Sequence, residues 1–321
     1  MLIWKKARWA VLIVLVVTLM VALVGCGGKT DQGSDNSGQT QKLAGEVKID
    51  GSSTVFPITE AVGEEFQKLH PDVRVTVGVS GTGGGFKKFV KGEIDIADAS
   101  RPIKDQEKEA AVQAKIEYIE LPVAYDGLSV VVNKDNTWVD KLTVEELKKI
   151  WEPDSKITKW NQIRPEWPDK KIELYGPGTD SGTFDYFTEV INGESGASRP
   201  DFTASEDDNV LVQGISGDNN SLGYFGYAYY IENKDKLKVV PIDDGSGKAV
   251  EPSEQTINDG SYKPLSRPIF IYVNKASLGK PEVKEFVNYY LTEGPVFVPE
   301  VGYVQMPEDT YKENLAAIGV K

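Results

Sequence analysis

The chain has 321 residues, of which 40% are hydrophobic and 26% are charged, and its formal net charge at pH 7 is −13. This length allows two domains of ordinary size, and the hydrophobic content is sufficient for a folded core. The acidic balance argues against nucleic acid as a partner, although a small anion can still bind where local dipoles replace net charge.

The first 25 residues predict a targeting segment. Lys5, Lys6 and Arg8 precede an apolar run over residues 9–24, which is short for a membrane span. The run ends in Leu23-Val24-Gly25-Cys26, and small residues before a lone cysteine resemble a bacterial lipobox. The resemblance implies cleavage before Cys26 and attachment of lipid to its sulfur. An uncleaved signal anchor is the alternative.

Residues 26–44 are expected to form a flexible tether. They are rich in glycine and polar side chains and contain almost no apolar residue, so they cannot bury enough surface to order themselves. The single cysteine of the chain excludes an internal disulfide and a cysteine metal cluster, and no other metal site is expected.

Two strand–loop–helix units and a third strand–loop segment follow the tether, and each loop carries hydroxyl groups. The first loop, Gly51 to Val55, lies between a strand at 47–50 and a helix. The second, Ser80 to Gly85, follows a strand at 73–79 and precedes a helix expected to begin at Phe86. This glycine-rich loop lacks the Gly-Lys-Ser/Thr ending of a P-loop. The third loop is Ser100-Arg101-Pro102, where the proline stops any strand.

A fourth loop, Gly178 to Thr183, lies between a short strand at 172–175 and a helical pattern from Phe184 to Ile191. The first N–H groups of a helix have no partner within the helix, and the helix dipole is positive there. Ser181 and Thr183 add hydroxyl groups that can cap the helix or bind an anion. The sequence therefore predicts an oxyanion cradle, with an ordinary capped helix as the alternative.

Arg101 is the arginine among these hydroxyl loops. A guanidinium group can grip an oxyanion through two parallel hydrogen bonds. The alternative is a surface arginine that pairs with Asp105.

Two buried strand runs divide the chain into lobes. Residues 116–121 suit a half-buried strand and residues 123–132 a buried one, and residues 128–133 have a late partner in residues 268–274. The segment between them contains a capping box, Thr143 to Glu146, and Trp151 and Trp160 as core aromatics. Pro281 to Thr292 predicts a C-terminal helix with a core face of five residues: Val283, Phe286, Val287, Tyr290 and Leu291. The alternation of strands and helices predicts an α/β fold with mixed, mainly parallel sheets.

In this order, the motifs Gly51-Ser52-Ser53-Thr54-Val55, Ser80 to Phe86, Ala99-Ser100-Arg101-Pro102 and Ser181-Gly182-Thr183-Phe184 resemble those of the phosphate-binding proteins of bacterial phosphate ABC transporters. The resemblance covers residues 45–321. It implies a two-lobed periplasmic-binding-protein fold of type II, with lobe 1 at 45–127 and 268–321 and lobe 2 inserted at 128–267. Two crossover strands would form the hinge.

The resemblance also implies a function. The chain would be a monomer, anchored by lipid on the extracytoplasmic face of the cell membrane, that captures inorganic phosphate without a cofactor and delivers it to the permease subunits. The implied ligand-binding residues come from all four loops: Ser53, Thr54, Val55, Ser80, Thr82, Ser100, Arg101, Ser181, Gly182 and Thr183.

One departure from the family concerns charge. Some members take their ligand-gripping arginine from just before the Ser-Gly-Thr, whereas this chain has Pro177-Gly178-Thr179-Asp180 there. The role therefore falls to Arg101. Those members also use an aspartate of the third loop to accept the proton of phosphate, where this chain has Ser100. The candidate proton acceptors are Asp180, Asp98 or a hydroxyl.

Other functions compete with this interpretation. The nearest alternative is a carrier of another tetrahedral oxyanion: sulfate, molybdate or tungstate. Asp180-Ser181-Gly182-Thr183 also spells an aspartic protease signature, but that chemistry needs a second copy, which the sequence lacks. A phosphatase would need a metal set or an activated nucleophile, and neither stands out. The chain is therefore not expected to be an enzyme.

Overall fold

The computed structural model describes residues 42–179 and 181–320. Four predicted features lie outside these residues: the targeting segment, the lipidation at Cys26, most of the tether and the candidate proton acceptor Asp180. Among the residues that the structure describes, none of the helices combines the length and apolar character needed to cross a bilayer.

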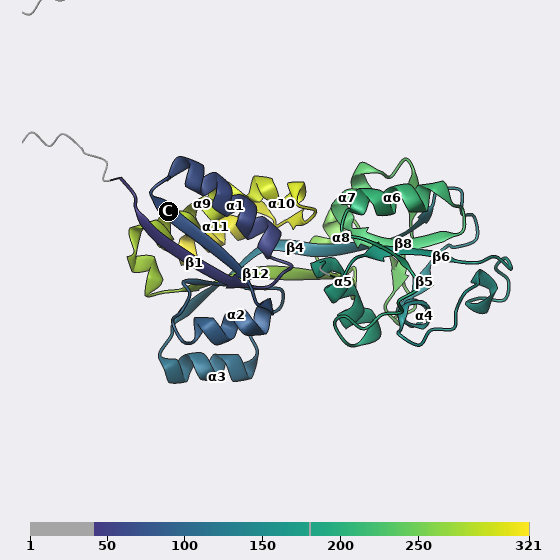
Figure 1. The fold of residues 1–321 in the computed structure, drawn as a ribbon, viewed down its shortest axis with the longest axis horizontal. Helices are drawn as coiled ribbons and strands as arrows, with labels where there is room; N and C mark the ends of the chain where they lie inside the picture. Colours follow the sequence, from purple (N-terminus) through teal and green to yellow (C-terminus); the bar gives the residue numbers. More distant parts are fainter. Residues whose placement is uncertain (1–41, 180, 321) are drawn as a thin grey trace, which may run out of the picture. The chain divides into compact units, whose positions relative to one another are not determined.

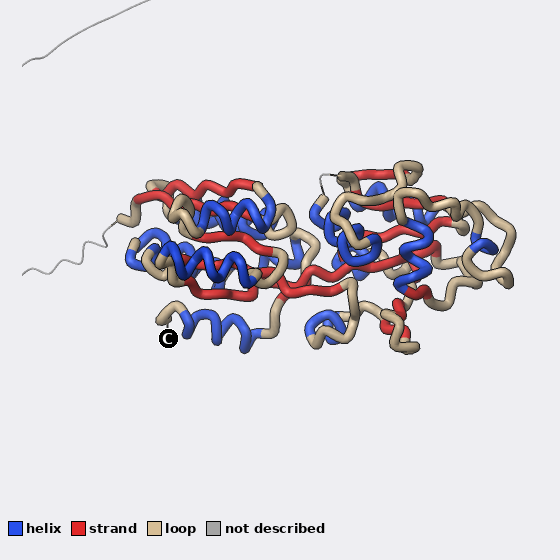
Figure 2. Tube along the Cα trace, turned by 90° about the horizontal axis from the view of Figure 1, so that it is seen from below, coloured by secondary structure: helices blue, strands red, loops and turns tan. Residues whose placement is uncertain are grey.

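Two antiparallel strands, β4 (Tyr118–Asn133) and β12 (Ser266–Asn274), join two α/β lobes (Figure 1, Figure 2). β4 pairs with β12 through Gly127 and with β8 from Leu128 onward, so one continuous strand belongs to both lobes. Sixteen residues of strand span roughly 50 Å. The predicted two-lobed α/β fold is confirmed.

Lobe 1 places helices against parallel strands. Its elements are β1 (Gly45–Gly51), α1 (Phe56–Leu69), β2 (Val73–Val79), α2 (Gly81–Phe89), β3 (Ile96–Ala99), α3 (Asp105–Ala114), η3 (Ser277–Gly279), α9 (Pro281–Thr292), η4 (Gly294–Val296), α10 (Phe297–Glu300), β13 (Val304–Gln305) and α11 (Glu308–Ala317). β1 pairs in parallel with β2 and β3, and β3 pairs antiparallel with β12.

Lobe 2 continues the sheet. Its elements are β5 (Leu142–Thr143), α4 (Val144–Trp151), η1 (Trp160–Gln162), β6 (Glu173–Pro177), α5 (Gly182–Phe187), the π-helix η2 (Thr188–Asn192), β7 (Thr203–Ser205), α6 (Asp208–Gly217), β8 (Ser221–Gly226), α7 (Tyr227–Glu232), β9 (Leu237–Val239), β10 (Ile242–Asp243), β11 (Ala249–Val250) and α8 (Glu254–Asn258). The main strand order is β2-β1-β3-β12-β4-β8-β6-β7, and β11-β10-β5 form a small separate sheet.

Each lobe has its own hydrophobic core. The core of lobe 1 packs α1 and α9 on the sheet and includes all five residues predicted for the core face of α9. The core of lobe 2 runs from Leu128 to Leu265, receives Val304 from β13, and contains Trp151 and Trp160 as predicted. The chain therefore passes from one core to the other within the crossing strands.

Two predicted elements differ from the structure. α2 begins at Gly81 rather than Phe86, because the glycines are part of the helix and allow it to lie on β1: a Cβ atom on Gly85 would be 2.7 Å from the Cα of Gly51. The runs 116–121 and 123–132 form the single strand β4. Pro122, which has no N–H to donate, marks the point where the pairing with β12 shifts register.

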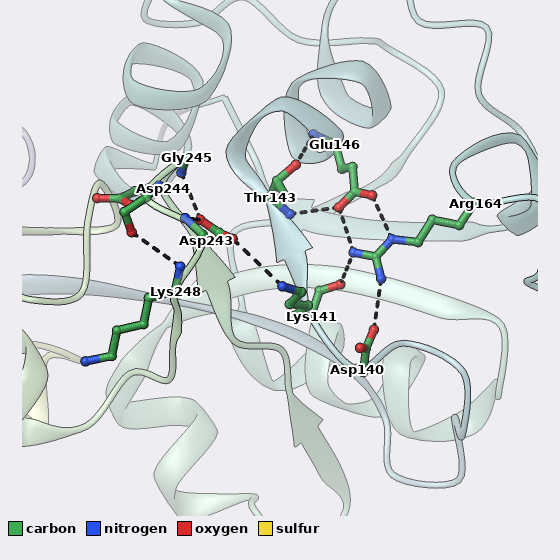
Figure 3. Close-up of polar contacts among 11 residues, drawn as sticks. Asp140, Lys141, Thr143, Glu146, Arg164, Asp243, Asp244, Gly245 and Lys248 are labelled. Carbon is green, nitrogen blue, oxygen red and sulfur yellow. Dashed lines mark hydrogen bonds and ion pairs between the residues drawn. The ribbon is translucent and has the colours of Figure 1, made fainter.

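A polar network fixes the beginning of α4 in lobe 2 (Figure 3). The predicted capping box is present: Glu146 N–H donates to Thr143 Oγ1 at 3.1 Å, and Thr143 N–H donates to Glu146 Oε2 at 2.8 Å. Arg164 donates to Glu146 and Asp140 and lies over the ring of Trp167. This arginine is thus held entirely by lobe 2.

Candidate anion-binding site

The three hydroxyl loops of lobe 1 follow β1, β2 and β3, so the parallel strands bring them to the same edge of the sheet. Thr82 and Ser100 meet there: their hydroxyl oxygens are 3.2 Å apart, and Ser100 N–H donates to Thr82 Oγ1 at 3.2 Å. The loop after β1 is anchored by Ser52 N–H, which donates to the backbone oxygen of Asp98 at 3.0 Å.

A cavity of about 220 Å³, called here the hydroxyl cavity, lies between these loops and lobe 2. Its lining residues are Ser52, Ser53, Thr54, Gly81, Thr82, Ser100, Arg101, Asp185, Glu189, Ser195 and Arg267. Five of the sequence-predicted residues are therefore brought together: Ser53, Thr54, Thr82, Ser100 and Arg101.

The lobe 2 loop approaches from the other side. Ser181 caps α5 by accepting a hydrogen bond from Thr183 N–H at 3.2 Å. Gly182 lies directly against Thr54 of lobe 1: a Cβ atom at Gly182 would be 2.7 Å from Thr54 Oγ1 and 2.8 Å from Thr54 Cα. Only glycine permits this approach without displacement of one lobe.

A second cavity, of about 310 Å³, shares Ser53 with the hydroxyl cavity. The second cavity is lined by Ser53, Phe56, Pro57, Val79, Asp126, Ser181, Gly182, Thr183, Glu206, Asp208, Gly226, Tyr229, Val301, Gly302 and Tyr303. The predicted residues of lobe 2 thus face this cavity and touch the hydroxyl loops at Thr54.

Three predicted residues line neither cavity. Val55 is buried in the core of lobe 1, and its N–H donates to Ser52 O at 3.2 Å. Ser80 is exposed and donates its hydroxyl proton to Asp50. Asp98, one candidate proton acceptor, points into the core behind the loops and is 1% exposed. The other candidate, Asp180, lies outside the described residues.

Arg101 is bound tightly to a carboxylate, although not to Asp105. Its Nη1 and Nη2 donate to the two oxygens of Glu107 at 2.8 Å each, a bidentate pair. Burial alone would raise the pKa of Glu107, but hydrogen bonds from Arg101 and from the Lys104 backbone lower it below its usual range. Most of the charge of Arg101 is therefore already balanced.

Arg267 is a site residue that the sequence analysis missed. It lies at the start of β12, opposite Asp126 of β4 in the antiparallel ladder, and lines the hydroxyl cavity. The sequence did contain a signal for it: Arg267 and Asp126 are opposite charges in or beside two mainly apolar strand runs. Because buried charges are rarely left unpaired, such a pair predicts that the two residues lie together. Burial raises the pKa of Asp126 to about 6, and Arg267 limits that rise.

Within residues 42–179 and 181–320, no three His, Cys, Asp or Glu side chains are grouped so that they could hold a metal ion. The donors that line the hydroxyl cavity are hydroxyl groups and two guanidinium groups, and Asp185 and Glu189 add two carboxylates. This donor set suits an anion with several acceptor oxygens.

Comparisons with known proteins identify relatives of this chain. A family model described as a PBP superfamily domain matches residues 35–293. The chain is 54% identical over 267 residues to the protein SphX of Synechococcus elongatus, covering 83% of this chain and 79% of that one. It is 43% identical over 311 residues to the phosphate-binding protein PstS of Staphylococcus haemolyticus, covering 96% of each.

Solved structures show the same fold. The crystal structure of a possible phosphate binding protein from Planctomyces limnophilus has a TM-score of 0.83 and 51% identity, covering 86% of this chain and 99% of that one. An ABC-type phosphate transport receptor from Vibrio cholerae has a TM-score of 0.60 and 25% identity, covering 81% and 100%.

The fold and the cleft site define a two-lobed binding protein of the PBP superfamily. Within that superfamily, the chain belongs to the family that contains PstS and SphX.

The buried carboxyl of Asp98 generates a prediction about pH and stability. Burial raises its pKa to about 7, an effect that the Thr59 hydroxyl reduces and the charge of Asp50 increases. The folded state thus holds a proton that the unfolded state has lost, and stability falls as pH rises through this window. Between pH 5 and 6.5, we expect Asp98 to lower the free energy of unfolding by about 1.4 kcal/mol per pH unit.

Urea denaturation of the wild type and Asp98→Asn at a series of pH values measures this slope. The wild-type curve should fall more steeply with pH than that of the variant. Parallel curves would show that Asp98 is ionised in the folded state across this range.

Proposed function

We propose that the protein captures inorganic phosphate between its two lobes and delivers it to the permease of an ABC transporter. The observation that carries this proposal is the meeting of hydroxyl loops from both lobes at Thr54 and Gly182, beside a cavity lined by hydroxyl and guanidinium groups. The names of its relatives, a phosphate-binding protein and an ABC-type phosphate transport receptor, support phosphate as the ligand.

The proposed ligand set replaces the water that phosphate loses on binding. Ser53, Thr54, Thr82 and Ser100 would donate from lobe 1, together with Arg101. Ser181, Gly182 and Thr183 would donate from lobe 2 through hydroxyl groups and backbone N–H groups at the start of α5. Each hydrogen bond to a charged group contributes roughly 1.5–3 kcal/mol, and micromolar affinity needs about −8 kcal/mol. A few well-placed bonds are therefore enough.

Closure would complete this donor set. β4 and β12 are the strands that connect the two cores, so a change of angle within them moves one lobe relative to the other. Donors from a single lobe would leave part of the anion in water. Donors from both lobes surround it only when Gly182 reaches Thr54.

A carboxylate in the cavity favours phosphate over sulfate. Near neutral pH phosphate keeps at least one O–H group, which needs an acceptor, whereas sulfate has none to donate. Asp185 of α5 lines the hydroxyl cavity one helical turn beyond Ser181. We propose Asp185 as the proton acceptor, because neither Asp98 nor a residue of the third loop lines this cavity with a carboxylate, and the other carboxylate there, Glu189, has a side chain that is 55% exposed and contacts Arg267.

The same proposal includes the location of the protein. Cys26 would carry a lipid after cleavage of residues 1–25, and residues 26–44 would let the lobes move away from the extracytoplasmic face of the membrane as a monomer. Contacts with lobe 1 begin near the end of this tether, where Leu43 packs against the core.

Calorimetric titration with phosphate, sulfate, molybdate and tungstate tests the binding function. Phosphate should bind at micromolar concentration or tighter and at least about tenfold more tightly than sulfate. Gly182→Val should weaken binding because its side chain collides with Thr54, whereas Gly217→Ala, with no atom within 4 Å of its Cβ position, should not. Asp185→Asn should reduce the preference for phosphate.

If the protein binds another of these anions more tightly than phosphate, that anion is the cargo and the proposal of phosphate is wrong. Turnover of a chromogenic phosphate ester by the purified protein would contradict a carrier function.

Expression of the full chain tests the anchor. The wild type should partition into the detergent phase and incorporate labelled palmitate, whereas Cys26→Ala should do neither. Palmitate incorporation by Cys26→Ala would place the lipid elsewhere.

A further inference from the structure

Arg267 differs from Arg101 in how its charge is balanced. Arg101 makes two hydrogen bonds of 2.8 Å to Glu107 and a third of 3.1 Å to the Pro102 carbonyl. The polar contacts of Arg267 are longer: 3.4 Å to Asp126, 3.4 Å to Thr54 Oγ1 and 3.6 Å to Glu189. Hydrogen bonds of this kind are normally 2.7–3.2 Å long. Arg267 therefore has donor capacity that its present partners use weakly.

The position of Arg267 is fixed even though its polar contacts are loose. Its guanidinium carbon lies 3.7 Å from the centre of the Tyr186 ring, the geometry of a close cation–π contact. Tyr186 is itself held by its hydroxyl, which donates to the Pro264 carbonyl at 2.6 Å. The backbone is restrained as well, because Pro268 biases the residue before it toward an extended conformation. The guanidinium plane is thus held in place before any ligand binds.

Arg267 also contacts both lobes and both crossing strands. It belongs to the crossing strand β12 and pairs with Asp126 of the crossing strand β4. It reaches Thr54 of lobe 1, and it contacts Tyr186 and Glu189 of lobe 2. Its side chain is only 16% exposed, so its interaction with an anion is weakly screened by solvent.

We propose that Arg267 is the guanidinium that neutralises the bound oxyanion and ties it to the hinge, while Arg101, held by Glu107, mainly shapes the wall of the cavity. This inference rests on the proposed function and identifies Arg267 as the principal charged residue that binds the anion.

Two neighbours of Arg267 are expected to change their interactions when the anion binds. Glu189 has a side chain that is 55% exposed, so it can turn to solvent and leave its 3.6 Å contact. Thr54 can donate its hydroxyl proton to the anion while its oxygen still accepts the 3.4 Å contact from Arg267. Asp126 stays behind the guanidinium group and keeps it oriented, as a carboxylate does for an arginine in a buried pair.

A purely structural arginine at the hinge is the competing explanation. Arg164 offers a matched control, because it too has a side chain of low exposure, 19%, and is paired with carboxylates (Figure 3). It also lies over an aromatic ring, that of Trp167. It belongs to lobe 2 alone and lines neither inter-lobe cavity.

The test uses the complete protein with both lobes. Inorganic phosphate is the probe, and its affinity is measured by calorimetry. Arg267→Gln alone would leave Asp126 buried without its cation, so the main variant is the double substitution Arg267→Gln with Asp126→Asn. Arg267→Lys keeps the positive charge but loses the planar guanidinium group, with its paired N–H donors and its stacking on Tyr186. Arg101→Gln and Arg164→Gln complete the series, and circular dichroism with thermal melting reports folding.

We expect the double variant to bind phosphate at least about 100-fold more weakly than the wild type, the upper range for one charge-assisted contact pair. Arg267→Lys should be intermediate, Arg101→Gln should lose about tenfold, and Arg164→Gln should bind as the wild type does. The dissociation constant of the double variant should also depend less on salt concentration, a change that loss of a mere structural contact would not cause.

The proposal is overturned if the folded double variant binds within about threefold of the wild type, or if Arg101→Gln loses more affinity than the double variant. If the double variant does not fold, Arg267→Lys binding as tightly as the wild type overturns it equally. Absence of phosphate binding by the wild type would instead reject the proposed function itself.

Discussion

The close approach of Gly182 to Thr54 is the constraint on which the site depends. A Cβ atom at Gly182 would be 2.7 Å from the Thr54 hydroxyl oxygen, so only the smallest residue lets the start of α5 meet the loop after β1. The strands and helices that carry these two residues belong to different cores. The contact between Gly182 and Thr54 therefore depends on the angle at which the crossing strands β4 and β12 hold the two lobes.

Local electrostatics reconcile an acidic protein with an anionic ligand. The chain has a formal net charge of −13, whereas the hydroxyl cavity gathers two guanidinium groups and several hydroxyl donors beside two carboxylates, Asp185 and Glu189. The two arginines are not equivalent, because Glu107 occupies the fork of Arg101 at 2.8 Å, whereas among residues 42–179 and 181–320 the polar contacts of Arg267 are 3.4 Å or longer. The guanidinium group of Arg267 is held in place by stacking, and its N–H donors make only long polar contacts, so these donors can bind an anion without breaking strong hydrogen bonds.

Much of the fold could be predicted from the sequence, because the signals were local. The alternating run 73–79 and the helix 281–292 appear with the expected bounds, since each has a complete apolar face and clear stops. The start of α2 could not be predicted in this way. Glycine is a poor helix former, and Gly81 to Gly85 become helical only because tertiary packing on β1 favours it.

The candidate site was predicted where motifs are contiguous and missed where they are not. Ser53, Thr82 and Ser100 could be found because each lies in a loop after a strand. Arg267 was missed because its relation to the loops depends on strand pairing across 141 residues of sequence, between Arg267 and Asp126. Non-local pairing of this kind requires the register of the sheet, which no single stretch of sequence contains.

The most direct test of the central claim is a crystal structure of the protein with phosphate bound. We expect the anion in contact with both lobes, accepting hydrogen bonds from the Thr54 loop, from the N-terminus of α5 at Gly182, and from the guanidinium of Arg267. Phosphate bound to one lobe alone, or on the surface away from the hydroxyl cavity, would contradict the account.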